Sequence, residues 1–383
     1  MESVDVDPAG IAIMVRKSEF LILKTDPIIA PAANILKQQI LSVGGDCAVA
    51  REVPTGQAPP TPVILMATRR QYERLIINLK QQCFGLDKLG TEIEGFLARI
   101  SAPRKFHIGQ QEYQTDQKTL IMGILNVTPD SFYDGGRYAE MSAAIETALK
   151  MEADGADLID IGGESTRPGS DPIPAEVEIA RLKPVLEQLQ MRLKIPISID
   201  TYKSAVAEWT LNNGALIIND ISGLNFDSQM AGTIAKHNAG VILMHIKGTP
   251  KNMQADPHYT NLIDEIMKYL SDSVQKARTA GIDGSKIFID PGIGFGFGKT
   301  AEDNYRIMRY LAEFQSLGLP ILVGPSRKAF IGQVLNLPAD ERLEGTLAAV
   351  TAAVLNGADL VRVHDVKAAV RAVKIADAIK GKS

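Results

Sequence analysis

The chain is poor in cysteine and carries no excess of positive charge. Its 383 residues include only two cysteines, Cys47 and Cys83, which lie too far apart for a CxxC pattern. This spacing argues against a zinc site and predicts reduced thiols in a cytoplasmic protein. The formal net charge is −4, and no basic stretch alternates with aromatic residues, so nucleic acid is not an expected partner. The composition instead favours small-molecule ligands.

Long apolar segments are also missing. The N-terminus, MESVDVDPAG, is acidic and lacks the apolar core of a signal peptide. No apolar run approaches the roughly 20 residues that are needed to span a bilayer. These absences predict a cytoplasmic protein that does not enter a membrane.

A standard nucleotide-binding loop is absent as well, although the stretch IDPGIGFGFGKTAEDN at 289–304 resembles one. A P-loop would need glycine five positions before Gly298, where the chain has isoleucine. The dinucleotide fingerprint fails because its third glycine would fall on Phe297 or Lys299. The stretch is therefore interpreted as a strand that ends at Asp290, followed by a glycine-rich turn and a helix.

Eight short apolar runs, each ending on a polar residue, recur between positions 120 and 364. Most of the segments between them have the helical spacing of apolar residues. This alternation is typical of parallel strands that helices bury on both faces. Eight units predict a (β/α)8 TIM barrel with its active site at the carboxyl ends of the strands, and an open doubly wound sheet is the alternative. The runs are Leu120–Asn126, Asp157–Thr166, Pro196–Asp200, Ala215–Asp220, Gly240–His245, Lys286–Asp290, Pro320–Lys328 and Ala358–His364.

Residues 1–102 have a different pattern and predict a small α/β domain ahead of the barrel domain at 103–383. The first domain contains the proline-rich loop PTGQAPPTP and no catalytic constellation, so we expect a packing or interaction module there. The stretch from Phe106 to Thr119 is interpreted as a hairpin that closes the bottom of the barrel.

Polar side chains follow the predicted strands. A single aspartate at a strand end is more often a helix cap or a turn residue than a ligand. Because a closed barrel brings all strand ends to one mouth, the whole set favours a binding site. The set comprises Asn126, Asp130, Thr166, Arg167, Asp200, Asn219, His245, Asp290, Lys328, Arg362 and His364.

The set divides by chemistry into two halves, with His245 interpreted as a packed neighbour. Guanidinium, imidazole and amide donors suit an anion such as phosphate. Carboxylates, an amide and an ammonium suit a flat heterocycle with N–H donors and a carbonyl. The phosphate half comprises Asn126, Arg167, Arg362 and His364, and the heterocycle half comprises Asp200, Asn219, Asp290 and Lys328. One substrate with a heterocyclic end and a phosphate end would satisfy both halves.

Two longer motifs, MGILNVTPDSFYDGG and DLIDIGGESTRPGS, resemble the signature stretches of the dihydropteroate synthase family. The motifs SIDTYK, NDISG, MHIKGTP, DPGIGFG, GPSRKAFIG and RVHD resemble the remaining motifs of that family and follow in its order. The resemblance extends from Phe106 to about Ala378 and implies the same barrel. It implies condensation of 6-hydroxymethyl-7,8-dihydropterin diphosphate with p-aminobenzoate to 7,8-dihydropteroate and pyrophosphate, with Mg²⁺ as cofactor. By family habit it also implies a homodimer.

The resemblance also implies a role for each site residue. The residues around the pterin would be Asp200, Asn219, Asp290 and Lys328, with Met244 packed on the ring. The residues at the diphosphate would be Arg167, Arg362 and His364, with Asn126 as a ligand of Mg²⁺. The residues at the p-aminobenzoate side would be Thr166, Pro168 and Ser326, with Phe132 closing over it.

The expected chemistry stabilises a leaving group. A diphosphate that departs from a CH₂ beside an electron-rich dihydropterin leaves a resonance-stabilised cation, which a weak aniline nucleophile can capture without a strong base. Lys328, Arg362 and His364 are the candidate catalytic cations and donors. Asp130 is either a loop carboxylate that steadies the cation or orders the loop, or a turn residue after Pro129.

The chain departs from the family pattern DPGIGFGK by an extra Phe-Gly pair between Asp290 and Lys299. Either Phe295 or Phe297 is therefore the candidate aromatic residue over the substrate. The unchanged spacing from Asp290 favours Phe295.

Three rival functions fit the pattern less well. A corrinoid methyltransferase with the same pterin-binding barrel would not need the phosphate-binding motif RVHD. A silent paralogue that binds a pterin or a partner protein would have lost Asn126, Arg362 or His364, and all three are present. A second folate-pathway activity in residues 1–102 would need a phosphate site that this segment lacks.

Overall fold

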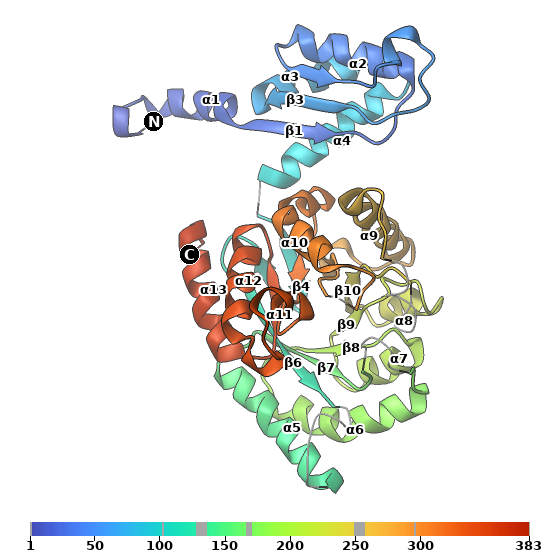
Figure 1. Cartoon of the computed structure of the whole chain (residues 1–383), viewed down its shortest axis with the longest axis vertical. Coiled ribbons are helices and arrows are strands. Elements are labelled where there is room, and N and C mark those ends of the chain that lie inside the picture. Colours follow the sequence, from blue (N-terminus) through green and yellow to red (C-terminus); the bar gives the residue numbers. More distant parts are fainter. Residues whose placement is uncertain are drawn as a thin grey trace. The chain divides into compact units, whose positions relative to one another are not determined.

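The computed structural model describes residues 2–101, 103–127, 136–165, 171–248, 257–294 and 296–382. The chain forms two compact units, Met1–Ala102 and Pro103–Ser383, and the first is coloured blue to cyan in Figure 1. The first unit contains a three-stranded sheet, and the second contains an eight-stranded sheet.

The N-terminal unit is an antiparallel sheet covered by helices. Its strands pair in the order β1-β3-β2, and helices α2, α3 and α4 share one apolar core with them. Helix α3 begins at a capping box in which the side chains of Thr68 and Gln71 accept each other's backbone N–H groups. The elements are α1 (Pro8–Ser18), β1 (Phe20–Lys24), α2 (Ala30–Ser42), β2 (Asp46–Ala48), β3 (Ile64–Thr68), α3 (Arg69–Leu79) and α4 (Leu86–Ser101).

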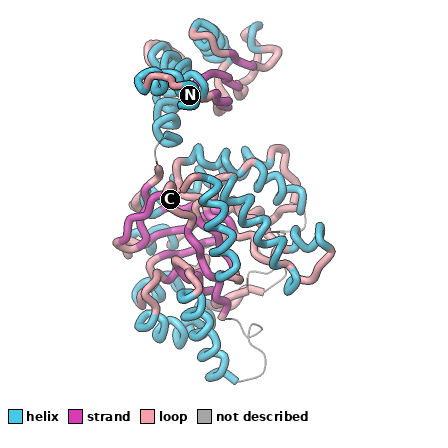
Figure 2. Tube along the Cα trace, turned by 90° about the vertical axis from the view of Figure 1, so that its left-hand side faces the viewer, coloured by secondary structure: helices cyan, strands magenta, loops and turns pink. Residues whose placement is uncertain are grey.

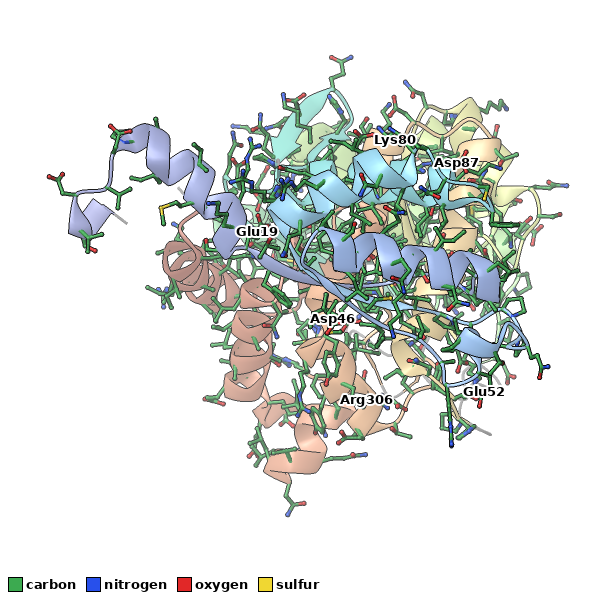
Figure 3. All side chains as sticks on the ribbon, turned by 90° about the horizontal axis from the view of Figure 1, so that it is seen from above. Glu19, Asp46, Glu52, Lys80, Asp87 and Arg306 are labelled. Atoms are coloured by element: carbon green, nitrogen blue, oxygen red, sulfur yellow. The ribbon has the colours of Figure 1, made fainter. Side chains whose placement is uncertain are left out.

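The sheet of this unit has one buried and one exposed face. Leu65 of β3 lies in the helix-covered core, whereas Phe20 and Ile22 of β1 are 59% and 66% exposed. This difference follows from the two-residue period of side chains along a strand. Charged side chains such as Lys80 and Asp87 lie on the outer surface of the unit (Figure 3). The predicted small N-terminal α/β fold is confirmed.

The second unit is a parallel barrel. Its strands pair in the order β11-β10-β9-β8-β7-β6-β13-β12, and a parallel bridge between Ile289 and Ile321 joins the two ends of the sheet. The predicted TIM barrel is therefore confirmed, and the open-sheet alternative is wrong. The strands are β6 (Leu120–Asn126), β7 (Leu158–Gly162), β8 (Ile197–Asp200), β9 (Ile217–Asp220), β10 (Gly240–Met244), β11 (Ile287–Asp290), β12 (Leu322–Val323) and β13 (Leu360–Val363).

Helices surround the barrel strands, as the cyan tubes around the magenta ones show (Figure 2). Outward-facing strand residues such as Ile159, Ile199 and Val241 are fully buried with the apolar stripes of these helices. No described helix is long and apolar enough to cross a membrane. The helices are α5 (Gly136–Ala153), α6 (Ala175–Arg192), α7 (Ser204–Asn212), α8 (Met230–Lys236), α9 (Leu262–Thr279), α10 (Ala301–Arg309), α11 (Ala329–Leu335), α12 (Leu343–Leu355) and α13 (Val366–Lys380).

A hairpin fills the amino-terminal end of the barrel, as the sequence predicts. Strands β4 (Lys105–Ile108) and β5 (Gln111–Gln114) pair antiparallel. Phe106 packs with residues near the starts of the barrel strands, and its ring meets that of Phe288 edge-on with 5.2 Å between centroids. Because this end is packed with apolar side chains, the polar site lies at the opposite end.

Candidate active site

The described site residues lie at the carboxyl ends of the barrel strands. Asn126 ends β6, Asp200 ends β8 and Asp290 ends β11, while Arg362 lies in β13 and His364 follows it. The other described site residues are Asn219, Met244, Ser326 and Lys328. The predicted site residues that fall outside the described residues are Asp130, Phe132, Thr166, Arg167, Pro168 and Phe295.

Arg362 lies at the centre of a group of buried polar side chains. Its Nε donates to Asp160 Oδ2 at 2.6 Å, and its Nη2 donates to Asp200 Oδ2 at 2.8 Å. Asn219 Nδ2 donates to the same oxygen of Asp160 at 2.9 Å. The sequence pattern assigns Arg362 to the phosphate half, but the structure pairs it with carboxylates around the heterocycle half. The two halves are therefore physically coupled.

Asp160 is a site residue that reasoning from strand ends misses. It lies inside β7 and is fully buried, whereas the predicted set contains residues at or just beyond the ends of the apolar runs. A carboxylate within an apolar strand is rarely buried without a partner, so the run LIDIG contains a usable signal. Asp160 Oδ1 and Asp200 Oδ1 are buried and accept no hydrogen bond from the described residues. Both oxygens are therefore available to accept hydrogen bonds from N–H groups.

Asp290 and Lys328 are held by the backbone of the glycine-rich loop. Asp290 is buried, and its Oδ1 accepts a hydrogen bond from the backbone N–H of Gly292 at 2.7 Å. Lys328 Nζ donates to the carbonyl oxygen of Ile293 at 2.9 Å. The loop that resembles a phosphate loop therefore positions a carboxylate and an ammonium.

Burial favours the uncharged forms of the site's aspartates, lysine and histidine, and so shifts their pKa values. It raises the pKa of Asp200 to about 7, against the opposing effect of Arg362, and raises the pKa of Asp290 to about 6. It lowers the pKa of Lys328 to about 8, and the nearby Arg362 adds to that shift. Burial also lowers the pKa of His364 to about 4, so its imidazole is neutral at pH 7. Shifts of this kind cluster at functional sites.

A strained turn places Ser326 against His364. Ser326 Oγ lies 2.9 Å from His364 Nδ1 and accepts the backbone N–H of His364 at 3.2 Å. The next residue, Arg327, has a φ of 54°, a left-handed conformation that costs a non-glycine residue about 1–2 kcal/mol. Two hydrogen bonds from its guanidinium to Asp365, of 2.9 and 2.6 Å, hold the turn in this shape.

His245 is a packed residue beside a buried lysine. It is 4% exposed, and its Nδ1 lies 2.8 Å from Nζ of Lys299, which is 1% exposed. Lys299 Nζ also donates to the carbonyl oxygens of His245 and Phe297, at 3.2 Å each. Burial lowers the pKa of Lys299 to about 7. Lys299 therefore links the glycine-rich loop to the residue that follows β10.

Oxygen donors for a hard cation lie beside Gly162. A Cβ added to this glycine would lie 3.6 Å from Asn126 Oδ1 and 3.9 Å from Asp200 Oδ2, in ordinary van der Waals contact with both, so the two oxygens lie near the same glycine. The described residues contain no cluster of three or more histidine, cysteine or acidic side chains for a metal. The side-chain oxygen of Asn126 is the kind of donor that Mg²⁺ takes together with substrate oxygens and water.

Comparisons with known proteins agree with this geometry. The family described as pterin binding enzyme matches residues 122–364. The dihydropteroate synthase of Synechocystis sp. is 46% identical over 278 residues, which are 72% of this chain and 96% of that protein. The chain belongs to the dihydropteroate synthase family. Among solved structures, the dihydropteroate synthase of Clostridium difficile in the presence of pteroic acid is 44% identical with a TM-score of 0.66, covering 70% of this chain and 98% of that one.

A third relative extends the similarity to the N-terminal unit. A probable bifunctional folylpolyglutamate synthase/dihydropteroate synthase of Halobacterium salinarum is 37% identical over 380 residues, which are 99% of this chain and 45% of that protein. A match of this length includes residues of Met1–Ala102 as well as the barrel. The N-terminal unit therefore accompanies a synthase barrel in this relative too.

Proposed function

We propose that this member of the dihydropteroate synthase family transfers the pterinylmethyl group of 6-hydroxymethyl-7,8-dihydropterin diphosphate to the amine of p-aminobenzoate. The observation that carries the proposal is a group of three carboxylates at the barrel mouth. Asp160 and Asp200 pair with Arg362, and the charge of the nearby Lys328 acts on Asp200 and Asp290. A dihydropterin offers several N–H donors and one ring carbonyl, which are the complements of these groups.

The pterin ring is proposed to bind across the heterocycle half of the mouth. The carboxylates of Asp200 and Asp290 would accept ring N–H groups, and Asp200 Oδ1 has no other partner among the described residues. Lys328 would donate to the ring carbonyl, and the amide of Asn219 would complete the polar contacts. Met244, which is 5% exposed, would pack on the ring face.

The diphosphate is proposed to lie beside Arg362, His364 and Asn126. Because Ser326 Oγ accepts the backbone N–H of His364, its hydroxyl hydrogen is free to point at Nδ1. The neutral imidazole then carries its proton on Nε2 and can donate it to a phosphate oxygen. Mg²⁺ bound at Asn126 would supply further positive charge to the leaving group.

The chemical step needs charge stabilisation more than proton transfer. The C–O bond to the diphosphate breaks with its electron pair going to pyrophosphate, and the aniline nitrogen forms the new C–N bond and releases a proton. Cations fixed beside the leaving oxygens stabilise the developing charge, and burial strengthens their effect. Ser326 would line the p-aminobenzoate side together with the predicted loop residues Phe132, Thr166 and Pro168.

Pyrophosphate release tests the proposed function directly. The purified chain should release pyrophosphate from the pterin diphosphate only when p-aminobenzoate and Mg²⁺ are both present, and a sulfonamide competitor should suppress the release. Removal of the metal with EDTA should abolish turnover, and added Mg²⁺ should restore it. Release that does not depend on p-aminobenzoate would contradict the synthase function. Sedimentation velocity of the same preparation tests the predicted homodimer.

The pH dependence of kcat/KM should be bell-shaped. Asp200 and Asp290 accept N–H groups freely at both oxygens only when ionised, so kcat/KM should fall as the pH drops through their raised pKa values of about 7 and about 6. Lys328 donates best as an ammonium, so kcat/KM should also fall as the pH rises through its lowered pKa of about 8. Because kcat/KM reports the free enzyme, these limbs belong to the empty site. Lys328→Met should remove the alkaline limb, and a limb that persists in this variant would assign it to another group.

A further inference from the structure

Phe297, from the extra Phe-Gly pair, lies in a small apolar cluster at the mouth of the barrel. Met244 ends β10, and Asp290 pairs with it as the last residue of the neighbouring strand, so this cluster lies level with the site carboxylates. The cluster combines the buried Ile221, Met244 and Ile246 with the partly buried Tyr202, Phe226 and Phe297. Phe297, one of the two candidate aromatic residues, therefore lies at the wall of the proposed pterin site, while Phe295 is outside the described residues.

The ring of Phe297 lies against the ammonium of Lys328. Lys328 Nζ is 4.5 Å from the ring centroid, which is within the range of a cation–π interaction. The same ammonium donates to the carbonyl oxygen of Ile293 at 2.9 Å. Because an ammonium has three N–H bonds, the contact with Ile293 leaves donors for a ligand.

The loop backbone fixes the position of this ring. The carbonyl oxygen of Phe297 accepts hydrogen bonds from the backbone N–H of Lys247 at 3.3 Å and from Lys299 Nζ at 3.2 Å. Gly298 follows with a φ of 69°, and a Cβ there would come within 2.6 Å of the backbone oxygen of Lys247. A Cβ on Gly294 would come within 2.9 Å of the Phe297 ring. The ring is therefore held between Gly294 and Lys328.

We infer that Phe297 is a positioning residue for the pterin, because its ring holds the Lys328 ammonium where that ammonium donates to the ring carbonyl of the substrate. This inference rests on the proposed function. An aromatic face suits the task because Lys328 has the like-charged Arg362 as a neighbour. The π face attracts the ammonium without adding a titratable group to a site that already contains three carboxylates.

The test compares three variants with the wild type. Phe297→Leu removes the π face, and Phe297→Tyr keeps it. Phe226→Leu is the matched control, because Phe226 belongs to the same cluster but its ring packs on Tyr202, with 5.5 Å between centroids. Calorimetry gives the Kd of 6-hydroxymethylpterin, and steady-state kinetics give the pH profile of kcat/KM for the pterin diphosphate. The substrate titrates identically throughout, so differences between variants report the protein.

Phe297→Leu should raise the Kd of 6-hydroxymethylpterin by about 2- to 30-fold, which corresponds to the usual free energies of cation–π interactions. It should also move the alkaline limb to lower pH by up to about one unit, because the charged form of Lys328 loses an attractive neighbour. Phe297→Tyr should restore both properties. Phe226→Leu should leave the Kd within about twofold and the limb in place.

Two results would overturn the inference. One is wild-type affinity in Phe297→Leu, and the other is a raised Kd with an unmoved alkaline limb, which would make Phe297 an apolar wall that does not act through Lys328. A wild-type chain that does not bind 6-hydroxymethylpterin would instead overturn the proposed function itself. Thermal unfolding of each variant separates loss of folding from loss of binding, and Phe297→Met replaces the leucine variant if that variant does not fold.

Discussion

Replacing Arg362 with alanine should destabilise the folded chain by about 3–5 kcal/mol, which is the usual effect of leaving buried charges without their partner. Arg362 contacts Asp160 at 2.6 Å and Asp200 at 2.8 Å, and the variant removes the counter-charge of both. The kcat/KM should also fall by about a hundred- to a thousandfold, because a cation that stabilises the leaving group is lost. Urea denaturation measures the first effect, and steady-state kinetics at a temperature where the variant is folded measure the second.

Arg104→Ala is the matched control for this variant. Arg104 Nη2 lies 2.7 Å from the buried Asp359. This is a second arginine–aspartate pair in the same barrel, and neither of its residues is a predicted site residue. This control should lose stability while its kcat/KM stays within about twofold of wild type. Equal losses of activity in both variants would mean that Arg362 acts only through folding.

The coupling of the phosphate half to the heterocycle half predicts how Arg362→Ala affects the binding of the bare pterin. An arginine that binds only phosphate would leave the affinity for bare 6-hydroxymethylpterin unchanged when it is removed. Because Arg362 is hydrogen-bonded to two carboxylates beside the pterin site, Arg362→Ala should weaken the bare pterin as well as the diphosphate. Wild-type affinity for the bare pterin in a folded Arg362→Ala variant would contradict the coupling.

The second large effect is expected for Asp290→Asn, which should raise the KM for the pterin diphosphate by about a hundred- to a thousandfold. Asp290 Oδ1 already accepts the backbone N–H of Gly292 at 2.7 Å, so only Oδ2 remains for the substrate. The single amide oxygen of asparagine cannot serve both donors. If it keeps the bond to Gly292, its NH₂ group points at a ring N–H and two donors oppose each other. Calorimetry with 6-hydroxymethylpterin should show the same loss.

Asp220→Asn is the control for Asp290→Asn. Asp220 is fully buried at the end of β9, and burial raises its pKa to about 6. Among the described residues, its oxygens accept only local hydrogen bonds, from Ser222 N, Ser222 Oγ and Leu224 N, at 2.7 to 2.8 Å. This variant should change thermal stability and leave the KM within about threefold. A comparable rise in KM would show that any buried aspartate at the mouth gives the effect.

The barrel follows from local patterns along the chain. A run such as ALIIND needs burial on both faces because it is apolar at nearly every position, and the helical segments between runs supply the covering surfaces. The sequence also predicts where strands end. Asn126, Asp200 and Asp290 each interrupt an apolar run at the point where the observed strand ends. The sequence therefore determined the fold, the end of the barrel that carries the site and, through the family motifs, the reaction.

The pairings inside the site were decided only by the tertiary structure. Arg362 meets Asp160 across 202 positions of sequence, and neither local periodicity nor strand-end position shows that the guanidinium turns toward carboxylates. The position of Asp160 inside an apolar strand signals a buried carboxylate, but its partners Arg362 and Asn219 meet it only when the barrel closes. In the loop after Asp290, spacing leaves Phe295 and Phe297 as candidates and favours Phe295, which lies outside the described residues. The contact of Phe297 with Lys328 is visible only in the structure. The physical reason is the same in each case, because the partner of a buried charge is chosen by proximity in three dimensions.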